Sequence, residues 1–127
     1  MKKLNKKILI IEDEQSLRIS LQDTFIAEGF EVLAASDGKQ GLKLALENIP
    51  DIILLDILMP KMDGVAMLKK LRKNKKCLAI PVVLLTNLSY DKEVKEAIKY
   101  GATDFLVKAN WKLEDVIKKV KQRLCLK

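Results

Sequence analysis

The stretch DIILLDILMP, residues 51–60, holds an apolar run that ends on one internal carboxylate, Asp56. An ionised carboxylate among apolar side chains costs roughly several kcal/mol unless a cation or hydrogen-bond donors compensate it. An apolar run of this length, without polar alternation, is typical of a strand buried on both faces of a parallel sheet. We therefore expect Asp56 to end a central strand at the rim of the sheet.

The rest of the chain alternates short apolar runs with helical patterns. Four more runs predict strands, over residues 7–11, 30–35, 81–86 and 104–108. Apolar residues at helical spacing predict five helices, and Gly29, Pro50 and Gly101 are expected to end three of them. This alternation predicts a doubly wound α/β domain with a five-stranded parallel sheet and five helices. With the strand order 2-1-3-4-5, which we expect here, the first and third strands are neighbours at the centre of the sheet. We expect a single domain over residues 1–127, with no output domain.

The composition limits the classes of protein to consider. The 127 residues, 49% hydrophobic and 32% charged, fit one globular domain. The first apolar stretch ends at once in Glu12-Asp13-Glu14, so we expect no signal peptide, no membrane insertion and a cytoplasmic location. Cys77 and Cys125 show no metal-binding spacing and are expected to remain thiols. Histidine does not occur, which excludes His-based zinc sites and nucleophiles activated by histidine.

The net charge of +7 is unevenly spread, because basic residues concentrate in segments 1–7, 61–76 and 112–127. A basic surface favours nucleic acid or an acidic partner. Lysines solvated on helix faces explain the same pattern more simply, and we do not expect nucleic acid to be the main partner.

Polar residues are expected at the ends of four strands. Glu12 and Asp13 follow the first strand, Asp56 ends the third, Thr86 the fourth and Lys108 the fifth. In an open parallel sheet, ligands bind outside the carboxyl ends of the strands, so these residues are expected to meet. The acidic run, Thr86 and Lys108, each taken alone, more often have a plain structural role such as capping a helix, whereas for Asp56 the structural and functional roles are equally plausible. The joint pattern is what points to chemistry.

Three converging carboxylates repel one another unless a cation lies between them. Acidic oxygens without histidine or thiolate suit a hard divalent ion, and Mg²⁺ is our expectation. A lysine and a hydroxyl beside this ion could hold a phosphoryl group. Aspartate forms acyl phosphates in other enzymes, so the central carboxylate is a candidate phosphoryl acceptor.

With these motifs, the sequence resembles the response-regulator receiver domain of two-component signalling. The matching pieces are IIEDE (10–14), ILLDILMPKMDG (53–64), VVLLTN (82–87) and GATDFLVKAN (101–110). The resemblance covers essentially the whole chain and implies a flavodoxin-like fold. It also implies a phosphorelay function in which a sensor histidine kinase or a histidine phosphotransfer protein donates the phosphoryl group.

The resemblance assigns roles to individual positions. Asp56 would accept the phosphoryl group, Thr86 would hydrogen-bond it and Lys108 would pair with it. Asp13 and Asp56 would bind Mg²⁺ directly, Glu12 would bind it through water, and Leu58 would supply a backbone carbonyl. Phe105 and Thr86 would form an aromatic switch.

The switch would act on the face formed by the fourth helix, the fifth strand and the fifth helix. That face would bind a downstream protein. This chain would act as a monomer or as a dimer that forms on phosphorylation. Such a domain catalyses its own phosphorylation and slow dephosphorylation but is not a turnover enzyme.

The sequence departs from the family pattern in three respects. Ala109 stands where the family usually has proline after the lysine, and Asn87 is larger than the usual small residue after the threonine. Leu58 and Leu88 are apolar at positions thought to tune access of hydrolytic water, which predicts a long-lived phosphorylated form.

Two other classes of function compete with this interpretation. A phosphatase of the haloacid-dehalogenase type also uses a nucleophilic aspartate, but it needs a second aspartate where Leu58 stands. A receiver-like adaptor that is not phosphorylated, or a module that contacts nucleic acid, would not need the whole set of strand-end residues.

Overall fold

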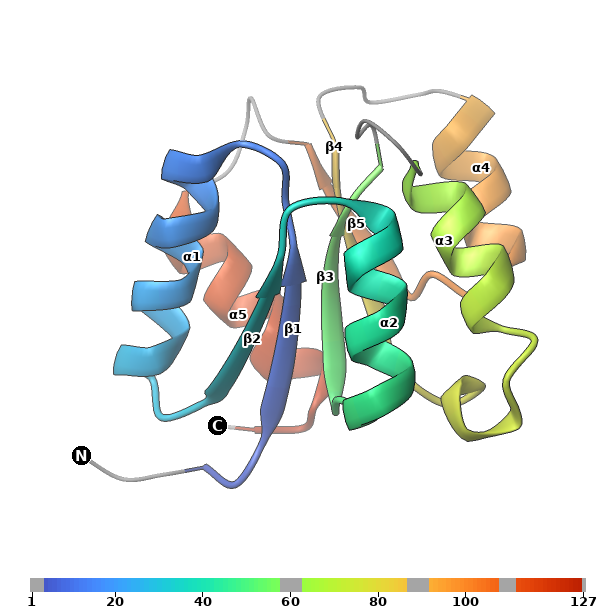
Figure 1. The fold of residues 1–127 in the computed structure, drawn as a ribbon. Coiled ribbons are helices and arrows are strands. Elements are labelled where there is room, and N and C mark those ends of the chain that lie inside the picture. Colours follow the sequence, from blue (N-terminus) through green and yellow to red (C-terminus); the bar gives the residue numbers. More distant parts are fainter. Residues whose placement is uncertain (1–3, 58–62, 87–91, 108–111, 127) are drawn as a thin grey trace.

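The computed structural model describes residues 4–57, 63–86, 92–107 and 112–126, without the side chains of Thr86 and Glu93. Strands and helices alternate along these residues (Figure 1). The strands are β1 (Lys7–Ile11), β2 (Glu31–Ala35), β3 (Ile52–Asp56), β4 (Val82–Thr86) and β5 (Asp104–Val107). The helices are α1 (Gln15–Ala27), α2 (Gly38–Asn48), α3 (Gly64–Leu71), α4 (Lys92–Lys99) and α5 (Leu113–Arg123), with a short 3-10 helix η1 (Lys75–Cys77) before β4.

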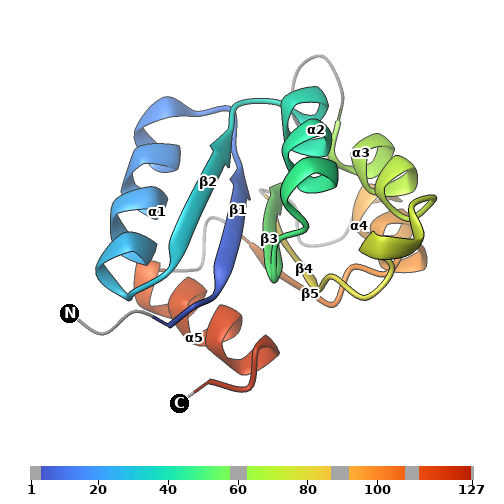
Figure 2. The same ribbon diagram turned by 60° about the horizontal axis from the view of Figure 1, so that its bottom comes forward.

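All neighbouring strands pair in parallel, in the order β2-β1-β3-β4-β5. The predicted doubly wound fold and strand order are therefore confirmed. Parallel pairing places every strand's carboxyl end at one edge of the sheet, which we call the carboxyl edge; the opposite edge is the amino edge. Figure 2 brings the amino edge forward. The 3-10 helix η1 is the one element described here that the sequence pattern did not predict.

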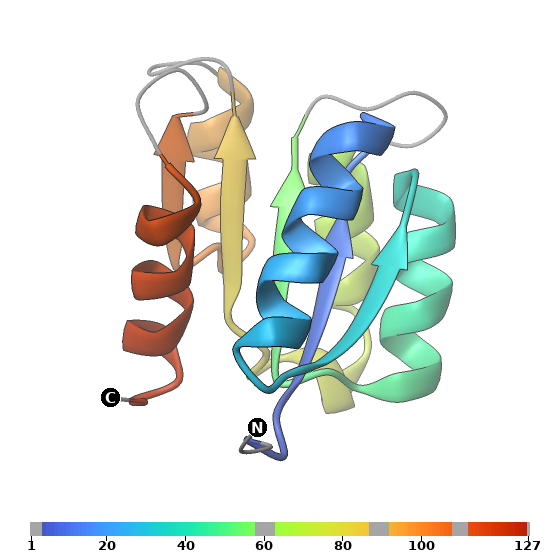
Figure 3. The same cartoon turned by 90° about the vertical axis from the view of Figure 1, so that its left-hand side faces the viewer.

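The sheet separates two apolar layers. Alternate residues of the central strands face α2, α3 and α4 on one side, where Ile53 and Leu55 pack against Met67 and Leu68. The other side faces α1 and α5, where Leu54 packs with Phe25 and Val116. Figure 3 shows α1 and α5 together in front of the sheet. All five residues of β3 are buried, and burial on both faces of the sheet explains why the four residues before Asp56 are all apolar.

The helix ends largely follow the predicted signals. Gly29 and Gly101, with φ of 99° and 85°, adopt the left-handed conformation just after α1 and α4. Asp37 caps α2 by accepting a hydrogen bond from the backbone N–H of Gln40 at 2.8 Å. Asp63 caps α3 in the same way. These caps set where the helices begin relative to the carboxyl edge.

Candidate functional site at the carboxyl edge

The acidic residues of the two central strands come together as predicted. β1 and β3 are neighbours, with Ile11 opposite Leu55, so Glu12 and Asp13 emerge beside the end of β3. Glu12, Asp13 and Asp56 each offer a carboxylate oxygen, and these oxygens lie within 4.8 Å of one another. We call these three residues the acidic cluster.

Burial differs within the acidic cluster. Glu12 is fully buried and Asp56 is 4% exposed, whereas Asp13 faces solvent. Like charges at this spacing repel, and burial strengthens the repulsion because less water screens it. The donor set is oxygen only, which matches the ligand preference of Mg²⁺ rather than of softer metals. The residues therefore fit the predicted ion by chemistry, spacing and access from solvent.

Main-chain hydrogen bonds fix the cluster from several sides. The N–H of Glu12 donates to the carbonyl of Ala35 at 3.1 Å, which continues the pairing with β2. The Oε2 atom of Glu12 accepts the N–H of Glu14 at 3.1 Å. Glu14 occupies the cap position of α1 without capping through its own side chain. Simple helix capping by Glu14 therefore does not explain the acidic run.

Arg18 contributes a contact that the sequence analysis missed. Its Nη1 donates to the carbonyl oxygens of Glu12 and Asp13, at 2.9 and 3.4 Å. A basic residue on the first turn of a helix after an acidic pair carries no distinctive signature, so nothing in the sequence marked it. The guanidinium group holds the backbone of the acidic pair and places a positive charge near the cluster.

Gly64 is needed at the site because two segments of backbone approach closely. A Cβ at Gly64 would lie 2.7 Å from the carbonyl oxygen of Asp56 and 2.8 Å from the Cα of Ile57. The N–H of Gly64 donates to the carbonyl of Ile57 at 2.7 Å. Gly64 is the first residue of α3, and this close approach of two backbones is the reason why a glycine is needed there.

The other predicted residues are placed only in part. In the β4–β5 pairing Thr86 lies opposite Val107, so the backbone of Thr86 ends β4 at the carboxyl edge; its side chain is outside the described structure. Leu58 and Lys108, predicted to hold the ion and the phosphoryl group, also lie outside it, as do Asn87, Leu88 and Ala109. Their predicted roles therefore stay predictions.

Phe105 lies on the edge strand β5 and is 36% exposed. Its N–H donates to Oδ1 of Asp104 at 2.8 Å, and Oδ2 of Asp104 pairs with Lys119 at 3.1 Å and Arg123 at 3.0 Å. Burial alone would raise the pKa of Asp104, but these hydrogen bonds outweigh it and leave the pKa below its usual value. One carboxylate thus joins the start of β5 to α5.

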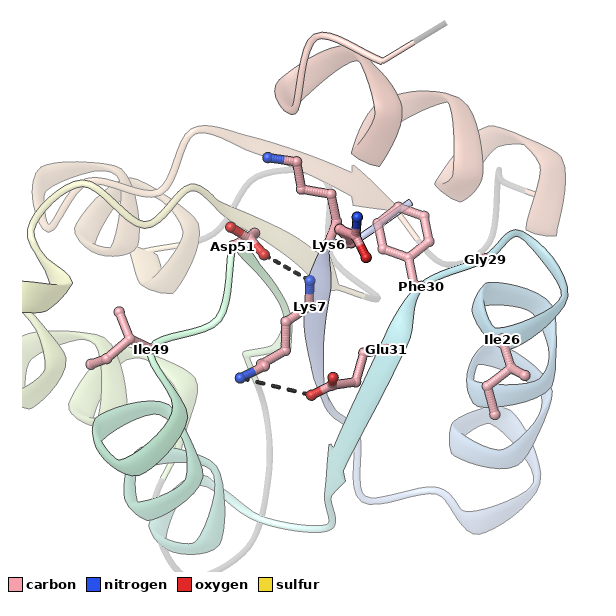
Figure 4. A pocket seen from close by; sticks show the side chains of 9 residues that line it. Lys6, Lys7, Ile26, Gly29, Phe30, Glu31, Ile49 and Asp51 are labelled. Atoms are coloured by element: carbon pink, nitrogen blue, oxygen red, sulfur yellow. Dashed lines mark hydrogen bonds and ion pairs between the residues drawn. The ribbon is translucent and has the colours of Figure 1, made fainter. Parts of the chain in front are cut away.

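A pocket of about 730 Å³ lies at the amino edge, away from the acidic cluster. Its lining includes Ile26, Phe30 and Ile49 together with two lysines and two acids (Figure 4). Lys7 Nζ lies 3.7 Å from Glu31, and the N–H of Lys7 donates to Asp51 at 2.7 Å. The charged lining of this pocket mixes lysines with acids and lacks the three converging carboxylates of the carboxyl edge, so we place the chemistry at the carboxyl edge.

No helix within the described ranges is long and apolar enough to cross a membrane. Cys77 is buried and Cys125 is exposed, and neither forms a disulfide. Burial raises the pKa of the Cys77 thiol, which keeps it protonated.

Known proteins with the same arrangement are signalling domains. The family model described as "Response regulator receiver domain" matches residues 8–121. The chain is 38% identical over 105 residues to the alkaline phosphatase synthesis transcriptional regulatory protein PhoP of Bacillus subtilis, covering 83% of this chain and 43% of that protein. It is 40% identical over 106 residues to the response regulator PleD of Caulobacter vibrioides, covering 83% of this chain and 23% of that protein. The chain thus spans less than half the length of these two curated relatives.

Among solved structures, the chemotaxis protein CheY4 of Vibrio cholerae matches with a TM-score of 0.85 and 30% identity. That match covers 92% of this chain and 97% of the other. Receiver domains are signalling modules rather than classical enzymes, and they typically partner with histidine kinases or phosphotransfer proteins.

Proposed function

Because the chain belongs to the response-regulator receiver domain family, we propose that it accepts a phosphoryl group on Asp56 in an Mg²⁺-dependent reaction. The observation that carries the proposal is the acidic cluster, where a nearly buried carboxylate ends the central strand β3 beside Glu12 and Asp13. Arrangements that crowd like charges are costly for stability, and they are characteristic of sites that bind a cation.

Each residue has a part in the proposed reaction. A carboxylate oxygen of Asp56 attacks the phosphorus atom, forming an O–P bond while the P–N bond to the donor histidine breaks. The electron pair of that bond stays on the histidine nitrogen, which takes up a proton from solvent. Asp56 needs no general base because it is already ionised. Thr86 orients the phosphoryl oxygens, and Lys108 balances their charge.

Mg²⁺ bound by Asp13, Asp56, the carbonyl of Leu58 and, through water, Glu12 would neutralise charge that develops on the phosphoryl oxygens. The described residues contribute in two further ways. Arg18 holds the carbonyl groups of the acidic pair, and Gly64 lets α3 pack against the backbone of Asp56. Both contacts keep the acceptor carboxylate in one position.

The output surface that we propose is the face formed by α4, β5 and α5. Phe105 is the proposed switch, because its exposed ring on the edge strand has room to change position when Thr86 moves toward the phosphoryl group. The partners would be a histidine kinase or phosphotransfer protein as donor and a downstream protein as target. The cytoplasmic location and the single-domain organisation stay predictions.

Intact-mass spectrometry tests the acceptor. Incubation with acetyl phosphate and Mg²⁺ should add one phosphate to the wild-type protein, and the gain should vanish in Asp56→Asn or when the metal is chelated. Asp37→Asn is the matched control, because it makes the same change at a capping residue where asparagine also caps well. A wild-type protein without any gain in mass would refute phosphorylation and favour an adaptor that is not phosphorylated.

Two further measurements separate the remaining alternatives. Steady turnover of a generic phosphate ester would favour a phosphatase. Binding to generic DNA that weakens steeply with salt would favour a nucleic-acid-contacting module. The predicted long lifetime of the phosphorylated form is tested with Leu88→Glu, which should lose the phosphate several times faster than the wild type if a polar group there orients water.

A further inference from the structure

Arg72 directly follows α3, and its guanidinium group lies among main-chain carbonyl groups at the amino edge. Nε donates to the carbonyl oxygen of Tyr100 at 2.9 Å, and Nη2 donates to those of Ile80 and Gly101 at 2.9 and 3.0 Å. Nη1 donates to two carbonyl oxygens of the turn at the end of η1. Five acceptors thus surround the five N–H donors of one arginine. Partial burial lowers the pKa of Arg72 below its usual value.

Gly101 completes the fit between Arg72 and the turn from α4 to β5. Its φ of 85° is one that L side chains rarely adopt. A Cβ at this position would lie 3.1 Å from Nε of Arg72. The backbone therefore turns sharply at the place where the guanidinium group binds it.

Lys69, one turn before Arg72 on α3, contacts the same end of α4. Its Nζ lies 2.8 Å from Glu96 and 5.4 Å from the centre of the Tyr100 ring. The hydrogen bond between Lys69 and Glu96 raises the pKa of the lysine and lowers that of the glutamate. Arg72 and Lys69 together hold the C-terminal end of α4 against α3.

The opposite end of α3 meets the acidic cluster. Gly64, the first residue of α3, packs against the backbone of Asp56 and donates its N–H to Ile57. The helix between its two ends is well buried, with Val65, Met67, Leu68 and Leu71 in the core. α3 is therefore a packed element that contacts the proposed phosphorylation site at one end and the α4–β5 turn at the other.

We propose that Arg72 is a positioning residue that fixes the α4–β5 turn to the end of α3, so that movement of α4 on phosphorylation is confined to its N-terminal end. α4 runs from the carboxyl edge, where β4 ends, to the amino edge, where Arg72 binds (Figure 1). The fixed turn makes α4 pivot about Tyr100 and Gly101 instead of sliding as a whole. The movement of α4 depends on the proposed phosphorylation of Asp56. The contact between Arg72 and the α4–β5 turn does not depend on it.

Amide hydrogen exchange tests the contact in the full chain without phosphorylation. The N–H groups of Tyr100, Gly101 and Ala102 donate to the last turn of α4, so their exchange reports opening of the turn. Arg72→Lys keeps the charge but loses the fork of five donors, and exchange of these amides should rise about tenfold relative to amides of α5. Arg123→Lys is the matched control, because Lys119 still pairs with Asp104.

Lys69→Gln is a second, milder variant. It tests the same contact between α3 and α4 in case the change at Arg72 destabilises the whole fold. It should raise exchange of the same three amides by a smaller factor. Unchanged exchange in both variants would overturn the role of Arg72 as an anchor, and so would equal acceleration throughout the sheet in Arg72→Lys.

Amide chemical shifts on adding beryllofluoride and Mg²⁺, a phosphoryl analogue with its metal, test the pivot. In the wild type the changes should be largest at the start of α4 and fall toward Tyr100. In Arg72→Lys they should extend through Gly101. Uniform changes along α4 in the wild type would overturn the pivot. A lack of any change at Asp56 and Asp13 would instead refute the proposed function, and the exchange measurement distinguishes that outcome from failure of the anchor.

Discussion

Charged side chains are arranged differently at the two edges of the sheet. At the carboxyl edge three carboxylates lie within 4.8 Å of one another, and two of them are buried. At the amino edge Lys7 pairs with Glu31, and Arg72 binds main-chain carbonyl groups of two segments, residues 77–80 and 100–101. The carboxyl edge gathers like charges in a way that suits a cation, whereas the contacts at the amino edge join neighbouring segments of the fold.

Substitution of Arg72 should give the largest loss of stability. Arg72→Met keeps an unbranched apolar stem but removes the guanidinium donors from several carbonyl groups, two of them in partly buried hydrogen bonds, so the free energy of unfolding should fall by about 3 kcal/mol. Urea denaturation measures the loss. Arg123→Met is the control and should cost below about 1 kcal/mol, because that side chain is largely exposed. Equal losses in the two variants would contradict the contrast between the edges.

Substitution of Gly64 should come next, because it disturbs the carboxyl edge directly. Gly64→Ala places a Cβ 2.7 Å from the carbonyl oxygen of Asp56, and the expected cost is about 2 kcal/mol. The displaced backbone should also slow phosphorylation by acetyl phosphate. Gly38→Ala is the matched control, since Gly38 is likewise the first residue of a helix capped by an aspartate. A stable Gly64→Ala protein with an unchanged phosphorylation rate would refute the close approach.

Magnesium should stabilise the protein by reversing the repulsion at the carboxyl edge. At a Mg²⁺ concentration ten times the dissociation constant, the free energy of unfolding should rise by about 1.4 kcal/mol. The rise should disappear in Asp13→Asn, which removes an exposed ligand without changing the core. Thermal unfolding with and without chelator measures both effects. An equal Mg²⁺ effect on both proteins would place the bound ion elsewhere.

The smallest effect concerns Asp104, which joins β5 to α5. Its pKa is lowered in the folded protein, so the carboxylate stabilises the fold above the unfolded pKa of about 3.9. This stabilisation is lost as the pH falls through the lower folded pKa. At pH 6, Asp104→Asn should lower the free energy of unfolding by less than about 1 kcal/mol, and the difference should shrink toward zero below about pH 3. Urea midpoints at the two pH values test this, and a difference that grows on acidification would contradict it.

The carboxyl edge was predictable because its residues depend on strand ends alone. Glu12, Asp13 and Asp56 each follow or end an apolar run, and parallel pairing necessarily brings such positions to one edge. The expected strand order 2-1-3-4-5 is the condition for these positions to be neighbours, and the structure confirms that order.

The residues that support the site were not predictable in the same way. Arg72 reaches carbonyl groups up to 29 positions away in the chain, and Arg18 binds the backbone of the acidic pair. Hydrogen bonds to backbone carbonyl groups require no particular residue type at the acceptor, so they leave no pattern in a sequence. The reason for Gly64 was also hidden, because a close approach between two backbones depends on where α3 packs.

The sequence by itself determined the layers of the fold and the residues at the rim of the sheet. Burial of apolar runs sets the strands, helical periodicity sets the helices, and parallel crossovers send the polar strand ends to one edge. Only the tertiary structure decided how closely the three carboxylates approach, which of them are buried, and how α3 joins the acidic cluster to the α4–β5 turn. The physical reason is that hydrophobic patterning acts along each segment, whereas contacts among side chains and backbone depend on the packed positions of several segments at once.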